Sequence, residues 1–266
     1  MEIKLSKEIG DFLLNVENPL LTSYKEKAPG SFKHSEEVAN LCDKIGRELK
    51  LDLNILKILG WYHDIGKMWY PEFYCENQPK DNNIHDSLNP EVSAHYIISH
   101  VANSIAILTT KIDNVPTEII RCISMHHGNR CLQSIFNKFS NVIYLTTKED
   151  EDKQKQNISK FTYPYSIPDN IYAIILMIAD STEATLKGLK AAGKVDESNV
   201  NTVINKIMTD LIEEKQTDKL TYEQGRIITE VLIGEYNAVN HKRVTTGYNS
   251  TDIINRMGDI REGGQL

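Results

Sequence analysis

A histidine followed directly by an aspartate, His63-Asp64, is the feature of this sequence with the clearest chemical meaning. An imidazole nitrogen and carboxylate oxygens are ligands that suit divalent transition metals. A carboxylate has two oxygens and can bridge two ions, whereas a lone histidine cannot. We therefore interpret the pair, together with ligands from elsewhere in the chain, as the centre of a two-metal site. The other ligands must come from segments that are distant in the sequence.

Four further histidines and one further acid lie where the expected helices could bring them to this pair: His34, His100, His126, His127 and Asp180. His34 lies on an apolar helical stripe, where a histidine is more often a core residue than a ligand. Asp180 interrupts the apolar part of a helix expected over 171–189, and a buried acid needs a partner, for which a metal is the most economical choice. Each candidate alone is only weak support for a metal site. The five together with His63-Asp64 favour one.

Helix geometry selects among the histidines. His95 lies well off the helix face of His100, so His100 is the favoured ligand. His126 and His127 are adjacent and diverge by about 100° on a helix, so both can serve one site only near the end of that helix. Gly128 follows them directly and predicts that end. The sequence thus places both histidines at a helix terminus.

Several of these residues have structural alternatives. Asp64 is also open to interpretation as a capping carboxylate near a helix end. Lys67 either contacts a phosphate oxygen or is a solvated cation near a helix C-terminus. A second His-Asp pair, His85-Asp86, lies in a polar segment and is interpreted as a turn or a supporting pair. The sequence leaves these alternatives open.

Composition bounds the class of protein. The chain has 266 residues, of which 40% are hydrophobic and 25% charged, as in an ordinary globular protein with ample material for a core. The net charge of -7 argues against a partner that is a polymeric nucleic acid. It does not exclude a small anionic substrate, because bound metal ions would invert the local field. The four cysteines show no C-x-x-C spacing, which predicts free thiols in a reducing compartment.

The pattern of apolar residues predicts an all-α fold. Helices are expected over these segments: 5–17, 34–50, 53–65, 90–111, from 117 towards His126-His127, 171–189, and two amphipathic stretches after Gly193 that are packing helices or a homodimer surface. The prolines and polar residues of 69–88 predict a loop without regular elements. The charged segment 146–160 is expected to be a mobile loop or lid. The longest apolar block, 172–179, is too short to span a bilayer, so we expect a cytoplasmic protein with no membrane contact.

With these residues identified, the sequence resembles the HD-domain phosphohydrolase superfamily, and within it the catalytic HD domain of membrane-receptor-type phosphodiesterases that hydrolyse cyclic di-AMP. The resemblance runs from about Asn18 to Tyr248. It is carried by an ordered series of motifs: Ala28-Pro29-Gly30-Ser31 before His34, His63-Asp64-Ile65-Gly66-Lys67, Glu76-Asn77-Gln78, His85-Asp86, Ser99-His100-Val101, His126-His127-Gly128, Phe161-Thr162-Tyr163-Pro164 and Ala179-Asp180-Ser181.

The resemblance implies an HD-domain helical bundle around a dinuclear metal site over 31–248, preceded by an N-terminal helical extension (1–30) and followed by a polar tail (249–266). One ion would be held by His34, His63, Asp64 and Asp180, and the other by Asp64, His100, His126 and His127. The family's metals are manganese or iron, so we expect two divalent ions, Mn²⁺ or Fe²⁺/Fe³⁺. The implied reaction is hydrolysis of a cyclic dinucleotide, cyclic di-AMP to pApA, by attack of a metal-activated hydroxide on phosphorus.

Substrate contacts are less closely matched to the family. Lys67 is the candidate for stabilising charge on the phosphoryl oxygens, and Trp69, Tyr70 or Tyr74 could stack on an adenine. Relatives tend to have basic residues where Trp69 and Tyr70 stand and an arginine where Thr162 stands. The cyclic di-GMP branch is disfavoured, because glycine instead of glutamate follows the paired histidines and no Gly-Tyr-Pro motif occurs. Two rival functions stay open: a nucleotidase or triphosphohydrolase acting on mononucleotides, and a nucleotide-sensing module without turnover.

Overall fold

The structure is a computed structural model that describes residues 3–79, 83–147, 157–196 and 198–246. Over these ranges the chain is helical, and the only β-type pairing is an isolated bridge between Cys131 and Thr162. The expected all-α class is therefore confirmed. The helices are α1 (Lys7–Leu14), α2 (Pro19–Lys27), α3 (Pro29–Glu48), α4 (Leu53–Tyr62), α5 (Pro90–Lys111), α6 (Thr117–Ser124), α7 (Gln133–Thr147), α9 (Ile171–Ala191), α10 (Val200–Glu213) and α11 (Tyr222–Thr246). Short 3₁₀ helices connect them: η1 (Ile65–Trp69), η2 (Pro71–Phe73), η3 (Cys75–Asn77), η4 (Ile84–Asp86) and η5 (Ser159–Phe161).

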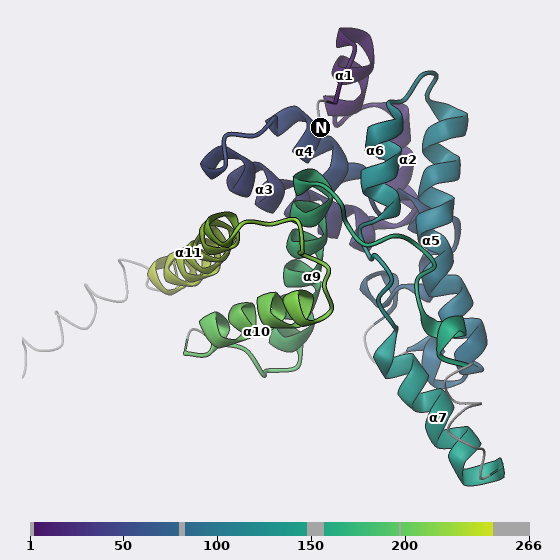
Figure 1. The fold of residues 1–266 in the computed structure, drawn as a ribbon. Helices are drawn as coiled ribbons and strands as arrows, with labels where there is room; N and C mark the ends of the chain where they lie inside the picture. The colour runs from purple at the N-terminus through teal and green to yellow at the C-terminus, as the bar shows by residue number, and fades with distance from the viewer. Residues whose placement is uncertain (1–2, 80–82, 148–156, 197, 247–266) are drawn as a thin grey trace, which may run out of the picture.

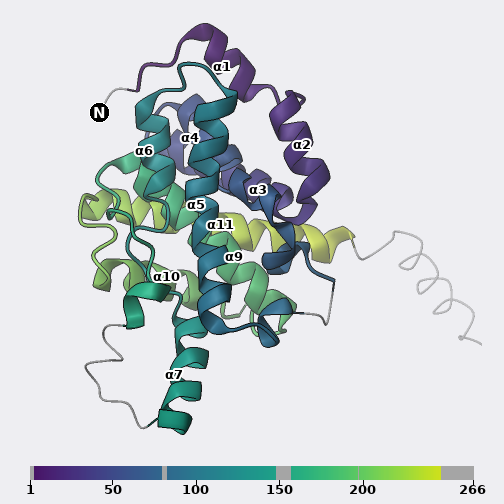
Figure 2. The ribbon, with the colours of Figure 1, turned by 90° about the vertical axis from the view of Figure 1, so that its right-hand side faces the viewer.

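The N-terminal half of helix α9 is buried, and α3, α4, α6 and α10 pack against this helix. All residues from Ala173 to Asp180 are buried. Figure 1 shows α9 between α10 and α11 on one side and α5 and α6 on the other. α1 and α7 lie at opposite ends of the molecule in both views (Figures 1 and 2). An acid in the middle of α9 therefore lies inside the bundle.

Side-chain caps fix where the helices begin. Asn18, Asp52, Asn89 and Asn170 each precede a helix and accept hydrogen bonds from backbone N–H groups of its first turn. α3 has no such residue. Its first-turn N–H groups, those of residues 30 and 31, instead donate to Oδ1 of Asn77, at 2.8 and 3.2 Å. The segment that contains η3 thus closes onto the start of the helix that carries His34.

Several sequence expectations differ from the structure. α1 spans only Lys7–Leu14 of the expected 5–17, and α6 ends at Ser124, so that His126 and His127 lie in the turn after the helix instead of in its last residues. α4 ends at Tyr62 instead of continuing to residue 65, and the chain tightens into η1 directly after His63-Asp64. The segment 69–88 was expected to lack regular elements, but it forms the short helices η2 to η4, because single 3₁₀ turns need only hydrogen bonds over three residues. The sequence pattern did not predict α2 and α7. Most of the expected lid (148–156 within 146–160) and the polar tail lie outside the described residues.

In the described part of the chain, each helix is either too short or too polar to cross a bilayer.

Candidate metal centre

The structure brings all seven candidate ligands together from five parts of the fold. His34 comes from α3, His63 and Asp64 from the end of α4, His100 from α5, His126 and His127 from the turn after α6, and Asp180 from α9. Six of them are at most 5% exposed. His127 differs, with 22% of its side chain exposed, so the site opens to solvent on its side.

The two oxygens of Asp64 face two separate groups of histidines. Oδ2 lies 3.5 Å from Nε2 of His34 and 3.3 Å from Nε2 of His63. Oδ1 lies 3.2 Å from Nε2 of His100 and 3.8 Å from Nε2 of His126. We name the group His34, His63, Asp64 and Asp180 the first position, and the group Asp64, His100, His126 and His127 the second position. In each group the potential ligand atoms lie within 4.8 Å of one another.

Backbone carbonyls orient three of the histidines. Nδ1 of His63, His100 and His126 lies 2.9, 2.6 and 2.6 Å from the carbonyl oxygen of the residue three positions earlier in the chain. A carbonyl only accepts, so Nδ1 carries the proton in each ring and Nε2 is left with its lone pair towards the site. The local backbone at these positions, which is helical at His100, therefore selects the tautomer that a metal needs.

The arrangement fits a pair of cations. Nε2 of His100 and Nε2 of His126 face each other at 3.1 Å, and two lone pairs at that distance repel unless a proton or a cation lies by them. Nε2 of His63 and Oδ1 of Asp64 are buried without a hydrogen-bond partner. Such orphaned atoms are costly in an interior and are expected where an ion binds. The nitrogen and oxygen donors are of the type that binds manganese or iron.

Without ions, the charges of the first position are balanced by protons. Burial lowers the pKa of His34, but hydrogen bonds to the Asp180 and Glu183 carboxylates outweigh this effect and bring the pKa to about 9. Burial likewise opposes, and Asp64 favours, protonation of His63, whose pKa is about 10. In the second position, burial and the neighbouring charge of His63 lower the pKa of His126 to about 3. A cation at the first position would therefore displace protons.

Asp64 does not cap a helix. It precedes η1, but its side chain accepts no hydrogen bond from the first turn. Burial raises the pKa of its carboxyl, yet the His63 and Lys67 charges outweigh that effect and hold the pKa well below the usual value. The structure therefore disfavours the capping interpretation and leaves an ionised carboxylate inside the bundle.

Lys67 is fixed between two carboxylates and is not a freely solvated cation. Its Nζ lies 2.7 Å from Oδ2 of Asp64 and 3.0 Å from Oε1 of Glu76. The same Oε1 accepts a hydrogen bond from the Ser31 hydroxyl at 2.7 Å. Burial raises the pKa of Glu76, but the Lys67 charge outweighs it and lowers the pKa to about 2. The ammonium group thus lies at the edge of the first position with its charge balanced by Glu76.

The three aromatic candidates differ in exposure. Trp69 and Tyr70 are 48% and 42% exposed. Tyr74 is buried, and its hydroxyl donates to the carbonyl oxygen of Tyr96 at 2.9 Å. Tyr74 therefore has little free ring surface for a base. A further aromatic, Tyr163, stacks on the His127 ring with centroids 4.3 Å apart and lies beside the open side of the site.

The other histidines expected to be outside the site are indeed outside it. His95 is exposed. His85 lies in η4, where Nε2 donates to the carbonyl oxygen of Phe73 at 2.8 Å, and Asp86 pairs with Lys138. The pair thus supports the loop that follows the first His-Asp pair and contributes no ligand to either position.

Sequence reasoning missed Ser104. Its hydroxyl accepts from the N–H of Gly66 and donates to the carbonyl oxygen of His63, both at 2.8 Å. A Cβ on Gly66 would lie 2.2 Å from the His100 carbonyl oxygen. η1 therefore lies directly against α5, and this contact sets Asp64 against His100. No local signal marks a serine on a helix for this role.

Sequence reasoning also missed two residues that contact the His-His turn. Gln216 follows α10, and its Nε2 donates to Oδ1 of Asn129 at 2.7 Å. Gly128 has a φ of +54°, and a Cβ there would lie 2.1 Å from Oε1 of Gln216. Arg130 donates its backbone N–H to the His127 carbonyl oxygen.

The Arg130 guanidinium lies near α9 on the same side. Nη1 donates to the Ser181 hydroxyl at 3.3 Å, next to Asp180, and Nε donates to the Glu214 carboxylate at 2.6 Å. The Arg130 and Glu214 side chains are 31% and 44% exposed. This cation therefore lies between the chain segments of two candidate ligands and has an exposed partner.

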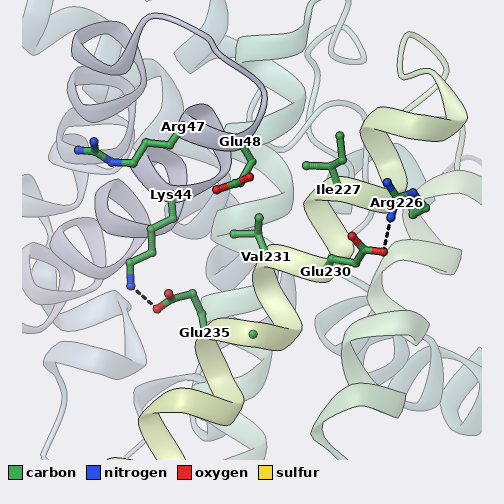
Figure 3. A pocket seen from close by; sticks show the side chains of 9 residues that line it. Lys44, Arg47, Glu48, Arg226, Ile227, Glu230, Val231 and Glu235 are labelled. Carbon is green, nitrogen blue, oxygen red and sulfur yellow. Dashed lines mark hydrogen bonds and ion pairs between the residues drawn. The ribbon is translucent and has the colours of Figure 1, made fainter.

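A groove between α3 and α11 offers no comparable chemistry. It has a volume of about 620 Å³ and is lined mainly by charged residues, among which Lys44 pairs with Glu235 and Arg226 with Glu230 (Figure 3). No histidine or cysteine lines it. The candidate site is therefore the buried cluster.

Comparisons with known proteins agree with this geometry. The family model described as HD domain matches residues 31–185. The chain is 28% identical over 234 residues to the cyclic-di-AMP phosphodiesterase PgpH of Bacillus subtilis and 30% identical to that of Listeria monocytogenes. Each match covers 87% of this chain but only 31% and 30% of the relative, so the chain spans about a third of their length. The crystal structure of the L. monocytogenes PgpH HD domain in complex with cyclic-di-AMP matches with a TM-score of 0.74 and 27% identity, over 85% of this chain and 99% of that one.

Proposed function

The chain belongs to the HD domain family, and from that premise we propose that it is a dinuclear-metal phosphodiesterase that opens cyclic di-AMP to pApA. The observation that carries the proposal is the division of Asp64 between two groups of buried ligands, one oxygen to each. A related HD domain has been crystallised with cyclic-di-AMP, which supports this choice of substrate. The extent of the domain over 31–248, the cytoplasmic location and a homodimer stay predictions.

The seven ligands would hold two ions, with Mn²⁺ or Fe²⁺/Fe³⁺ as the proposed metals. When bound, such ions supply Lewis-acid activation of water and of a phosphoryl oxygen. Asp64 fixes the separation of the two positions, and the buried histidines exclude competing water from them. The exposed edge of His127 marks the side from which a phosphodiester reaches the centre.

Two cations are suited to the substrate's phosphates. Lys67 is placed to stabilise charge on the phosphoryl oxygens at the metals, because it already lies against Asp64. Arg130 is the proposed contact for the second phosphate, since its partner Glu214 is exposed and a phosphate can replace it. A cyclic dinucleotide has two phosphates and uses both residues, whereas a substrate with a single phosphodiester uses one.

Base recognition is proposed for Trp69 and Tyr70. Both rings are substantially exposed and lie shortly after His63-Asp64, Trp69 as the last residue of η1 and Tyr70 directly after it. Stacking of a base on an exposed aromatic ring is worth about 1–3 kcal/mol. The burial of Tyr74 makes it a packing residue in this proposal.

The two rival functions use the same site and are separated by their products. A nucleotidase or triphosphohydrolase would release inorganic phosphate, a nucleoside or triphosphate from mononucleotides. A sensing module would bind without turnover, but the presence of all seven ligands favours an enzyme.

The test is an assay of metal-stripped protein to which Mn²⁺ or Fe²⁺ is returned, with cyclic di-AMP, cyclic di-GMP and a nucleoside triphosphate as substrates and chromatography of the products. We expect metal-dependent formation of pApA and its loss to background in Asp64→Asn. Asp86→Asn is the matched control, because Asp86 belongs to the other His-Asp pair and binds only an exposed lysine among its described contacts. Conversion of the triphosphate alone would refute the proposed substrate, and full activity of Asp64→Asn would refute the proposed centre.

A further inference from the structure

Glu183 is a buried acid next to the candidate centre that belongs to neither metal position. It lies on α9 one turn after Asp180 and is 5% exposed. Its Oε2 accepts a short hydrogen bond from Nδ1 of His34. Its Oε1 lies 3.5 Å from Nζ of Lys187, one turn further along the helix. An ordinary helix-surface ion pair would account for the lysine contact, but not for the burial or for the bond to His34.

The acceptor on His34 differs from the acceptors on three other candidate ligands. His63, His100 and His126 donate from Nδ1 to neutral backbone carbonyls. His34 donates to a carboxylate, which forms a stronger bond and makes the imidazole a more basic ligand than a carbonyl does. The Glu183 side chain thus fixes both the orientation of His34 and the nitrogen that faces the metals.

The first position receives more negative charge from its carboxylates than the second position does. The first position receives Oδ2 of Asp64 and Oδ1 of Asp180, which lies 2.9 Å from Nε2 of His34. The second position receives Oδ1 of Asp64 and three imidazoles, while the other oxygen of Asp180 lies 3.7 Å from Nδ1 of His127. The Lys67 charge next to Asp64 is balanced by Glu76. Glu183 adds a further carboxylate on the side of the first position only.

We propose that Glu183 is a positioning residue for His34 and makes the first position the tighter of two unequal metal sites. The inference rests on the proposed two-metal centre, but not on the identity of the substrate. It predicts that the two ions bind in sequence, with the first position filled before the second.

The test is a titration of the metal-stripped full chain with Mn²⁺. Binding affinities are measured by calorimetry and, in a separate titration, from the electron paramagnetic resonance signal of free Mn²⁺. We expect two classes of site in the unmodified protein. Glu183→Gln, which keeps the shape but removes the charge, should weaken the tighter class about 10- to 100-fold and leave the weaker class within about twofold. Lys187→Gln is the matched control, because it removes the cationic partner of Glu183 on α9 without touching His34, and should leave both classes unchanged.

Loss of affinity confined to the tighter class supports the inference. Unchanged affinities, or equal weakening of both classes, would overturn it, because a merely structural role affects both positions alike. If Glu183→Gln does not fold, Glu183→Asp replaces it: its shorter side chain keeps the charge but withdraws from His34, and the same one-sided loss is required. Unmodified protein that binds no Mn²⁺ would refute the proposed centre itself, whereas two bound ions and an insensitive Glu183→Gln would refute only this inference.

Discussion

The contact between η1 and α5 makes Gly66→Ala a sharp test of how the site is assembled. A Cβ on residue 66 would lie 2.2 Å from the carbonyl oxygen of His100 and 2.4 Å from the backbone nitrogen of Ser104. An ordinary contact needs at least 3.4 Å, so α5 must withdraw by about 1 Å. Both close atoms belong to the backbone of a helix, so no side chain can rotate away to relieve the clash.

The magnitude follows from this geometry. Overpacking of a close-packed interior typically costs about 1–3 kcal/mol, and a rigid helix on one side places this substitution at the upper end, about 3 kcal/mol. Metal ligands tolerate deviations of only about 0.2 Å, so a shift of about 1 Å between His100 and Asp64 should also abolish tight binding at the second position. Stability and metal binding should therefore fall together.

Two assays measure these effects. Urea unfolding of the metal-stripped protein, monitored by circular dichroism, gives the free energy of unfolding, and Mn²⁺ titration of the folded variant gives the number of bound ions. Gly188→Ala is the matched control, because Gly188 lies within α9 and a Cβ there meets nothing within 4 Å. It should raise the free energy of unfolding by about 0.4–1 kcal/mol. The reasoning fails if Gly66→Ala is as stable as the unmodified chain and still binds two ions.

Three further predictions concern other parts of the site. Ser104→Ala removes a hydroxyl that satisfies two buried backbone groups and should lower the free energy of unfolding by about 3 kcal/mol in urea, whereas a loss below about 0.5 kcal/mol would contradict this role. Arg130→Gln should raise the KM for cyclic di-AMP about tenfold with little change in kcat, and Glu214→Gln should lower the KM; no effect on hydrolysis kinetics from either would exclude the proposed phosphate contact. In metal-stripped protein, the pKa of His34 is raised from 6.5 to about 9, so its contribution is complete below pH 6.5 and the free energy of unfolding should decrease as the pH rises through about 9. Urea unfolding across this pH range measures that decrease, and a rising stability would show that the folded protein does not retain the proton.

The residue types of the site could be predicted from local sequence patterns, whereas their arrangement could be predicted only from the resemblance to a known family. An acid inside the apolar run of α9 and a histidine pair before Gly128 are visible as departures from helical patterns. The division of Asp64 between two groups is not visible in a local pattern, because it depends on the chain turning into η1 directly after His63-Asp64. It was expected only through the resemblance to a known family, and the two groups of the structure are the ones that the resemblance implied. Glu183 lies one helical turn after Asp180, so the sequence places both acids on the same face of α9. Only the structure shows that Glu183 is buried and therefore lies next to the candidate centre.

Local patterns also mislead where one residue serves two elements. Asn18-Pro19 appears to end the first helix, yet Asn18 caps α2 and Pro19 is its first residue. Similarly, Asn77 appears to belong to a structureless loop but caps α3 from a distance of 46 and 47 residues along the chain. Caps that come from distant segments leave no mark near the helix that they stabilise.

The contact of Gln216 with the His-His turn has a consequence for where the functional unit ends. The shared family core matched here stops at residue 185, but the amide that fills the space over Gly128 comes from the connection between α10 and α11. A fragment trimmed to residues 31–185 would keep all seven candidate ligands but lose the Gln216 side chain that packs against Gly128 and Asn129, directly after His126 and His127. A substitution or a bound molecule at the connection between α10 and α11 would therefore change the surroundings of the proposed second position without touching a candidate ligand.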